Sequence, residues 1–207
     1  MFTMYVYVLD TLADWETAPV MAELNSRRFF RKGAPEVAVK TAGLSREPVR
    51  TMGGLSIIPD CVLDDISPDD RTLLLLPGAD RWAEPEHAAA IGKARDLLSC
   101  GGIVCAICGA TVALANTGML NDRPHTSNGR GFLESFCPNY RGQHLYVDEP
   151  AVADGNMITA AATGALPFAR KIIEKLSVFS IETLEAWYAY FSNGRPEHFF
   201  ALMQSVQ

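Results

Sequence analysis

Residues 103–111 read Ile-Val-Cys-Ala-Ile-Cys-Gly-Ala-Thr, and the rest of the chain is organised around this stretch. Residues 103–107 carry no charge and are rich in β-branched side chains, which predicts a buried strand. Small residues follow Cys108, and residues 112–115 continue as a helix that ends at Gly118. A strand that turns sharply into a helix at a nucleophile is a nucleophile elbow. We therefore interpret Cys108 as a candidate nucleophile, with a helix N-terminus beneath it that favours the thiolate.

Other interpretations of the two cysteines in this stretch are weaker. A buried structural cysteine fits the local pattern, since cysteine is often buried. Cys105 and Cys108 also form a Cys-x-x-Cys motif, but a redox dithiol normally opens a helix, and Cys105 is predicted inside the strand. No second motif of this kind and no His-x-x-x-His is present, so we expect no metal site and no cofactor.

Composition limits the class of protein. The chain has 207 residues, 48% of them apolar, and a net charge of -6, which predicts one domain over 1–207 with a substantial core. The acidic charge argues against nucleic acid as a partner. Residues 1–9 lack a basic region and predict a first strand, and no run approaches the ~20 apolar residues that span a membrane. Five cysteines without a secretory signal favour a cytoplasmic location.

The order of predicted elements indicates the fold class. Strands are expected at 4–9, 36–41, 73–76, 103–107 and 157–161, with helices at 15–28, 86–99, 132–136 and 168–176 between or after them. Strands that alternate with helices predict a doubly wound, mostly parallel α/β sheet sandwiched by helices. In such sheets, ligands bind at the carboxyl ends of the strands. The loops after Leu9 and Leu76 and the elbow at Cys108 meet that condition.

Two of these loops supply candidate groups for a site around Cys108. Asp14 is expected to cap the first helix, whereas Glu16 is either a first-turn acid or a proton carrier for a thiol. The backbone N–H groups of Gly78 and Ala79, together with that of Gly109, are candidate oxyanion donors. An ordinary strand-ending Pro-Gly turn is the alternative for that loop.

Four histidines are available as a base. His125 lies about one helix beyond the elbow, where a catalytic partner could return to the site, although a histidine that anchors a loop is an equal alternative. His87 is expected in the exposed start of a helix.

Several stretches, in this order along the chain, resemble the ThiJ/PfpI superfamily, relatives of the class I glutamine amidotransferases. They are Asp-Trp-Glu at 14–16, Leu-Leu-Leu-Leu-Pro-Gly-Ala-Asp at 73–80, Ala-Ile-Cys-Gly-Ala at 106–110, and the segments 118–128 and 154–160. The resemblance covers residues 3–177 and implies a flavodoxin-like fold and a homodimer. It implies that Cys108 is the reactive cysteine, that Glu16 hydrogen-bonds its thiol, and that Ala79 and Gly109 donate to an oxyanion. Residues 178–207 are expected to form a helical C-terminal extension.

Two departures from the family pattern bear on the reaction. Protease-like members place a histidine directly after the cysteine, where this chain has Gly109. A second histidine position of many members falls on Asn128, and an extended strand would turn His125, three residues earlier, to the opposite face. Asn128 could orient a substrate or a water but cannot act as a base, so protease activity is the least supported function.

These observations predict a cysteine-dependent enzyme that acts on a carbonyl or amide of a small molecule, either glyoxalase-like or an amidase. The alternative is a redox or stress-response protein in which Cys108 is oxidised to a sulfinic acid beside Glu16. A third possibility is a module that binds a ligand without turnover. The expected partners are a small-molecule substrate and a second copy of the chain.

Overall fold

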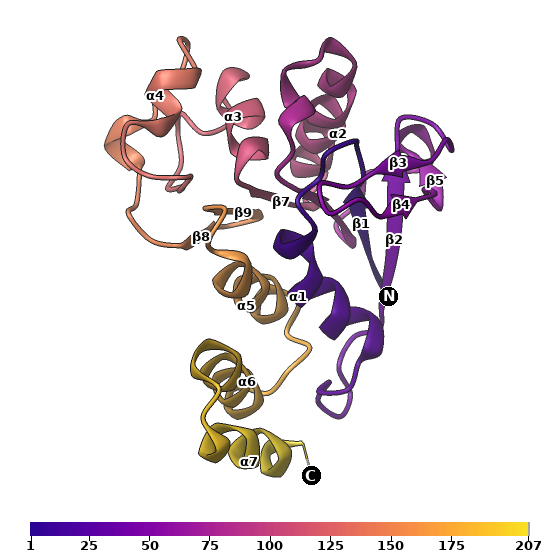
Figure 1. Ribbon diagram of the computed structural model, residues 1–207, viewed down its shortest axis with the longest axis vertical. Coiled ribbons are helices and arrows are strands. Elements are labelled where there is room, and N and C mark those ends of the chain that lie inside the picture. Colours follow the sequence, from indigo (N-terminus) through magenta and orange to yellow (C-terminus); the bar gives the residue numbers. More distant parts are fainter. Residues whose placement is uncertain (207) are drawn as a thin grey trace.

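A seven-stranded sheet forms the centre of the computed structural model, which describes residues 1–206 (Figure 1). Its strands lie in the order β5 (Cys61–Val62), β2 (Val37–Gly43), β1 (Phe2–Tyr7), β6 (Thr72–Leu76), β7 (Ile103–Ile107), β9 (Met157–Ala160) and β8 (Ala151–Asp154). All neighbouring pairs are parallel except β8 and β9, which form an antiparallel hairpin. The predicted flavodoxin-like, mostly parallel α/β fold is confirmed.

Helices cover both faces of the sheet (Figure 1). On one face, α1 (Asp14–Ser26) packs against α5 (Ala165–Leu176) and β2. On the other face, α2 (Ala88–Ser99) packs against β6 and β7, with α3 (Gly109–Asn116) and α4 (Phe132–Phe136) beside it. Short 3-10 helices connect these elements: η1 (Leu63–Asp65), η2 (Asp80–Ala83), η3 (Pro85–His87) and η4 (Gln143–Leu145).

The two central strands form the core of the sheet. Every residue of β6 and β7 is buried, and Leu73 to Leu76 pair in register with Ile103 to Ala106. Burial on both faces explains why these strands have continuous apolar runs instead of alternating sequences. Both strands point their carboxyl ends toward the same edge of the sheet, where the candidate site lies.

A small hairpin, β3 (Val49–Arg50) and β4 (Ser56–Ile57), stands beside the sheet. Asp14 holds it, because the Asp14 Oδ2 atom accepts a hydrogen bond of 2.6 Å from the N–H of Gly53. The prediction that Asp14 caps α1 is therefore wrong: Ala13 is the N-cap residue, and Asp14 lies in the first turn. Its carboxylate is used in a long-range contact that the local sequence does not reveal.

The chain ends in two helices, α6 (Ile181–Asn193) and α7 (Pro196–Ser205), which pack on each other. Helix α6 also packs on α5, and Ser180 caps it by accepting a hydrogen bond from the N–H of Thr183. Trp187 is 1% exposed and donates its Nε1–H to the buried carboxylate of Glu23 in α1 at 3.0 Å. This contact attaches the helices beyond residue 178 to the body of the fold.

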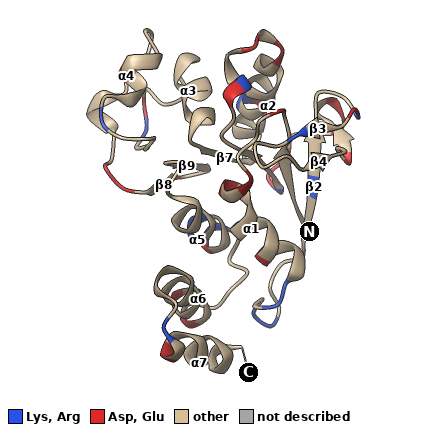
Figure 2. Cartoon of the chain, viewed as in Figure 1, with Lys and Arg blue, Asp and Glu red and all other residues tan. Residues whose placement is uncertain are grey.

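The charged residues are spread over separate elements, with Lys and Arg interspersed among Asp and Glu (Figure 2). Within residues 1–206, no helix is both long and apolar enough to cross a membrane.

Candidate active site

Cys108 occupies a strained turn between β7 and α3. Its backbone angles are φ 57 and ψ -124, a region that non-glycine residues rarely adopt. The N–H of Cys108 donates to the carbonyl of Ala160 at 3.0 Å, and its carbonyl accepts the hydroxyl of Thr111 at 2.6 Å. Contacts on both sides therefore hold the turn, as expected where strain serves a function.

Thr111 and Ser127 support this turn, and the sequence analysis did not single them out. The buried hydroxyls of these two residues are 2.7 Å apart. Because the Thr111 hydroxyl donates to the Cys108 carbonyl, it accepts its second hydrogen bond from Ser127. A threonine three residues after the cysteine, in the first turn of the helix, is the sequence signal that could have revealed this link.

Glu16 reaches the thiol from the first turn of α1. Its side chain is fully buried, and Oε2 accepts a hydrogen bond of 2.6 Å from the N–H of Gly78. Its other carboxyl oxygen, Oε1, is buried and has no hydrogen-bond partner within residues 1–206, and the Cys108 thiol lies close enough for the two groups to shift each other's pKa. The approach is so close that a Cβ on Gly78 would lie 2.6 Å from Oε2 and 2.8 Å from the Cys108 Cβ.

The pKa values of the two groups are coupled. Burial raises the pKa of the Glu16 carboxyl, and the hydrogen bonds from Gly78 and Cys108 only partly oppose it. Burial also raises the pKa of the Cys108 thiol, and the Glu16 charge adds to this effect, whereas the Asn128 amide and the Gly109 N–H lower it. The helix N-terminus therefore does not by itself produce the expected low-pKa thiol. The thiolate therefore forms most readily when Glu16 is protonated, because a neutral carboxyl group does not repel the negative sulfur.

Asn128 lies on the opposite side of the sulfur. Its Nδ2 donates to the Cys108 Sγ at 3.4 Å, and its Oδ1 accepts from the N–H of Ala162 at 2.8 Å. The second bond fixes the orientation of the amide, so the NH2 group faces the sulfur. Trp15 contacts the same residue as Asn128, since its Nε1 donates a hydrogen bond to the Ala162 carbonyl at 3.4 Å.

The three backbone N–H groups predicted as oxyanion donors, those of Gly78, Ala79 and Gly109, do not all have the same role. The N–H of Gly78 is used by Glu16, so Gly78 holds the acid and is not free to stabilise an oxyanion. The backbone of Ala79 approaches Gly109 closely: a Cβ on Gly109 would lie 3.0 Å from the Ala79 carbonyl oxygen and 3.6 Å from its nitrogen. Trp82 fixes this loop by donating its Nε1–H to the Pro77 carbonyl at 2.8 Å. Ala79 and Gly109 remain as the candidate oxyanion donors.

His125 is directed away from the thiol. Its Nδ1 lies 2.8 Å from the Arg123 carbonyl, which can only accept, so Nδ1 carries the proton. Its Nε2 therefore accepts the hydroxyl of Tyr140 at 2.5 Å, and burial raises the pKa of Tyr140 to about 12. Both ring nitrogens are occupied, and His125 anchors a loop. The hypothesis that His125 acts as a base toward Cys108 is not supported by this geometry.

The remaining cysteine of the motif is remote from solvent. Cys105 is 0% exposed within β7, and burial raises the pKa of its thiol strongly. Its position confirms the prediction that Cys105 lies inside the strand.

A cysteine at a strained strand-to-helix turn, beside a buried carboxyl group and at the carboxyl edge of a parallel sheet, defines an elbow-type α/β protein with a neighbouring Cys and Glu. The model of the DJ-1/PfpI family matches residues 3–175, and the chain belongs to that family.

Similar proteins span almost the whole chain. The uncharacterized protease YoaZ of Bacillus subtilis (strain 168) is 43% identical over 202 residues, which cover 98% of this chain and 96% of the relative. The crystal structure of a thiJ/pfpI family protein from Bacillus anthracis is 42% identical, with a TM-score of 0.96 over 100% of this chain and 98% of the other. The glutathione-independent glyoxalase DJR-1.2 of Caenorhabditis elegans is 31% identical over 140 residues, 65% of this chain and 71% of the relative.

Proposed function

We propose that the protein is a cysteine-dependent enzyme that converts a small 2-oxoaldehyde into a 2-hydroxy acid. The observation that carries the proposal is the closeness of the buried Glu16 carboxyl to Cys108, since a Cβ on Gly78 would lie 2.6 Å from the Glu16 Oε2 and 2.8 Å from the Cys108 Cβ. Both nitrogens of His125, in contrast, are occupied elsewhere. Acid–base chemistry at this sulfur therefore rests on one carboxyl group.

A 2-oxoaldehyde suits such a site because its reaction moves one proton between adjacent carbons. The thiolate adds to the aldehyde carbon, forming a C–S bond, and the resulting oxyanion takes a proton from Glu16. Glu16, now a carboxylate, removes the hydrogen of that carbon as a proton and returns it to the neighbouring carbon. The hydroxyl proton on the first carbon passes to the oxygen of the second, which leaves a thioester and a new hydroxyl. Water then cleaves the C–S bond, releasing the 2-hydroxy acid and the thiol. The net reaction adds one water and needs no external oxidant or reductant.

Other groups at the site fit roles in these steps. The N–H groups of Ala79 and Gly109 would stabilise the oxyanions of the addition and hydrolysis steps. The Asn128 NH2 group, oriented by Ala162, would hold the substrate carbonyl or the attacking water. The similarity to a glutathione-independent glyoxalase supports this substrate class.

Amide or peptide hydrolysis is less well supported. It requires protonation of an amine leaving group, for which cysteine hydrolases commonly use a neighbouring histidine. Here Gly109 follows the cysteine, and its missing side chain makes room for Trp82, whose ring would lie 3.4 Å from a Cβ at that position.

The test is turnover of methylglyoxal to lactate by the purified chain. We expect Cys108→Ser to abolish turnover and Glu16→Gln to reduce it by two orders of magnitude or more, in line with loss of a general acid–base (~100-fold). Cys100→Ser is the matched control, because Cys100 is an exposed thiol at the end of α2. Lactate formation that survives in Cys108→Ser would contradict the proposal.

A redox role is the second candidate, because Oε1 of Glu16 is buried near Cys108 and has no hydrogen-bond partner within residues 1–206. A protonated Glu16 would donate to a sulfinate oxygen at Cys108 and stabilise that state. Stable gain of two oxygens at Cys108 under mild peroxide, with no turnover of methylglyoxal, would favour this role. The homodimer and the cytoplasmic location stay predictions, to be tested by the mass of the protein in solution and by fractionation.

A further inference from the structure

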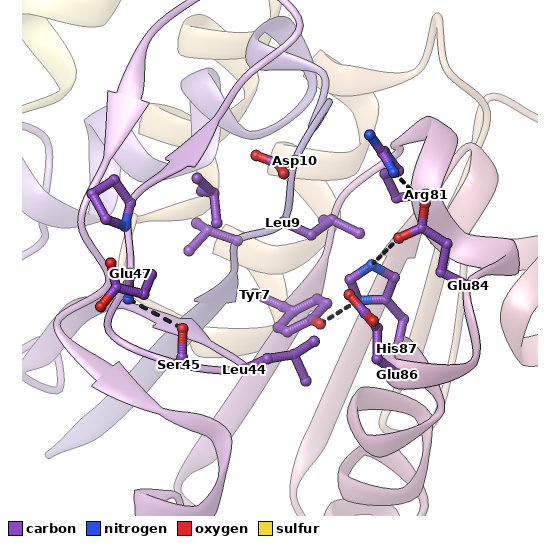
Figure 3. A pocket seen from close by; sticks show the side chains of 13 residues that line it. Tyr7, Leu9, Asp10, Leu44, Ser45, Glu47, Arg81, Glu84, Glu86 and His87 are labelled. Atoms are coloured by element: carbon purple, nitrogen blue, oxygen red, sulfur yellow. Dashed lines mark hydrogen bonds and ion pairs between the residues drawn. The ribbon is translucent and has the colours of Figure 1, made fainter.

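A second group of chemically active side chains lies apart from Cys108, in the segment that follows the Ala79 loop. Glu84, Glu86 and His87 each offer one ligand atom, and these atoms lie within 4.8 Å of one another (Figure 3). They line a cavity of about 210 Å³ between the ends of β1 and β2 and the helices η2 and η3. We propose that this group binds a divalent transition-metal ion, with Zn²⁺ as the probe, through His87 Nε2 and the two carboxylates.

Local backbone geometry brings the ligands together. Pro85 opens η3, and the N–H of His87 donates to the Glu84 carbonyl at 3.1 Å. In a 3-10 turn, side chains at positions i and i+3 lie one above the other. Glu84 and His87 therefore face the same side, and the His87 Nε2 lies 3.9 Å from the Glu84 Oε2. Metal bonds of about 2.0–2.2 Å need only a small closure of that gap.

The imidazole is the observation that distinguishes this group from an ordinary acidic cluster. His87 is 5% exposed, contrary to the expectation of an exposed helix start, and its ring points toward the cavity. Within residues 1–206, Nε2 has no hydrogen-bond partner, since Glu84 lies beyond hydrogen-bond distance.

A second shell holds the ring in place. The Tyr7 hydroxyl lies 2.6 Å from the His87 Nδ1, and the rings of Tyr7 and Trp82 contact the imidazole edge-on. Metal-binding histidines usually donate their other N–H to such a partner, which leaves the ligating nitrogen unprotonated. Tyr7 also lines the cavity, so its own O–H can turn toward the cavity when it accepts from Nδ1.

The charge of the cavity favours a cation. Carboxylates of Asp10, Glu47, Glu84 and Glu86 line it, against the single guanidinium of Arg81. Arg81 pairs with Glu84, and a bound ion would replace that contact. Three protein ligands facing an open cavity leave a coordination position for water or a small ligand.

The experiment is a zinc titration of the full chain by calorimetry, repeated in a variant in which Cys61, Cys100 and Cys108 are serine. This variant removes the thiols that are not buried and that would bind zinc themselves. We expect saturable binding of one equivalent in the serine variant, and at least tenfold weaker binding when His87→Gln or Glu86→Gln is added to it. Tyr7→Phe is expected to weaken binding by roughly 10–100-fold, as for other second-shell changes.

His144→Gln is the matched control, because His144 is exposed in η4 and lies outside the cavity. Glu86 is exposed, so Glu86→Gln tests the site even where His87→Gln does not fold. Equal affinity of the serine variant with and without Glu86→Gln, or no saturable binding in the serine variant, would overturn the proposal.

Discussion

The Asn128 amide donates to the Cys108 sulfur at 3.4 Å and is oriented by the Ala162 N–H on its other side. This donor lowers the pKa of a thiol that burial raises. Asn128→Ala is therefore expected to raise the thiol pKa and to slow alkylation of Cys108 about fivefold at neutral pH, for a hydrogen bond of about 1 kcal/mol. The measurement is the iodoacetamide rate at Cys108 by mass spectrometry, with the exposed Asn116→Ala as control. Equal rates in Asn128→Ala and wild type would show that the amide does not act on the sulfur.

Glu16 is expected to reduce the stability of the fold above acidic pH. Because burial raises its pKa, the native state binds the proton more tightly than the unfolded chain does. The contribution of this tighter proton binding to the free energy of unfolding is fully present below the ordinary glutamate pKa of 4.5. It is lost as pH rises through the higher pKa of Glu16 in the native state. Glu16→Gln does not titrate, so its Tm relative to wild type should increase over that range. Thermal melts at a series of pH values test whether the Tm difference between Glu16→Gln and wild type grows as pH rises. Glu134→Gln, at an exposed position, is the control.

Gly78 is expected to tolerate no side chain. A Cβ there would lie 2.6 Å from the Glu16 Oε2 and 2.8 Å from the Cys108 Cβ. Gly78→Ala is expected to cost about 1–3 kcal/mol of stability by overpacking and to disrupt the pairing of Glu16 with the thiol. Gly92→Ala is the control, since a Cβ at Gly92 in α2 meets nothing within 4 Å, and about 0.5–1 kcal/mol of stabilisation is expected there. Urea unfolding and the Cys108 alkylation rate report the two effects, and unchanged alkylation in Gly78→Ala would contradict this expectation.

His125 is expected to affect stability and not reactivity. His125→Leu removes the acceptor of the buried Tyr140 hydroxyl, and leaving such a group unsatisfied costs about 1–3 kcal/mol. Tyr140→Phe in the same background should recover part of that loss, because it removes the unsatisfied donor. Urea unfolding measures the coupling between the two residues. A large fall in the alkylation rate of Cys108 in folded His125→Leu would instead restore a role for this histidine at the site.

Trp187 is expected to attach the C-terminal helices to the body of the fold through Glu23. Trp187→Phe keeps an aromatic ring but removes one donor from a carboxylate that is 2% exposed. We expect a loss of about 1–3 kcal/mol, with Tyr188→Phe on the same helix close to wild type. Chemical denaturation gives the difference, and limited proteolysis after residue 178 shows whether α6 and α7 loosen first. Equal stability of the two variants would show that the hydrogen bond carries no net free energy.

Much of the fold could be predicted because the decisive signals are local. The run of leucines at 73–76 and the apolar stretch at 103–107 have no polar face, and strands buried on both sides need none. The small residues around Cys108 likewise reflect a turn in which the backbone approaches itself. Helix and strand periods are properties of neighbouring residues, so they can be identified without knowing where the chain goes next.

The arrangement of the site depended on contacts between distant parts of the chain. Glu16 takes the N–H of Gly78, 62 residues away, and that contact removes Gly78 from the candidate oxyanion donors. Asn128 faces the sulfur while His125, three residues earlier, bonds Tyr140 and the Arg123 carbonyl. No local pattern encodes which of these two side chains reaches Cys108, because the choice is set by the packing partners of each.

The sequence by itself determined the doubly wound sheet, the elbow at Cys108 and the placement of candidate groups at the carboxyl ends of the strands. Only the tertiary structure decided which groups meet there, that burial raises the pKa of both Cys108 and Glu16, and that His87 faces a separate cavity. The physical reason is that secondary structure follows from the periodicity of neighbouring residues. Burial, hydrogen-bond partners and pKa shifts arise from atoms brought together across the whole chain.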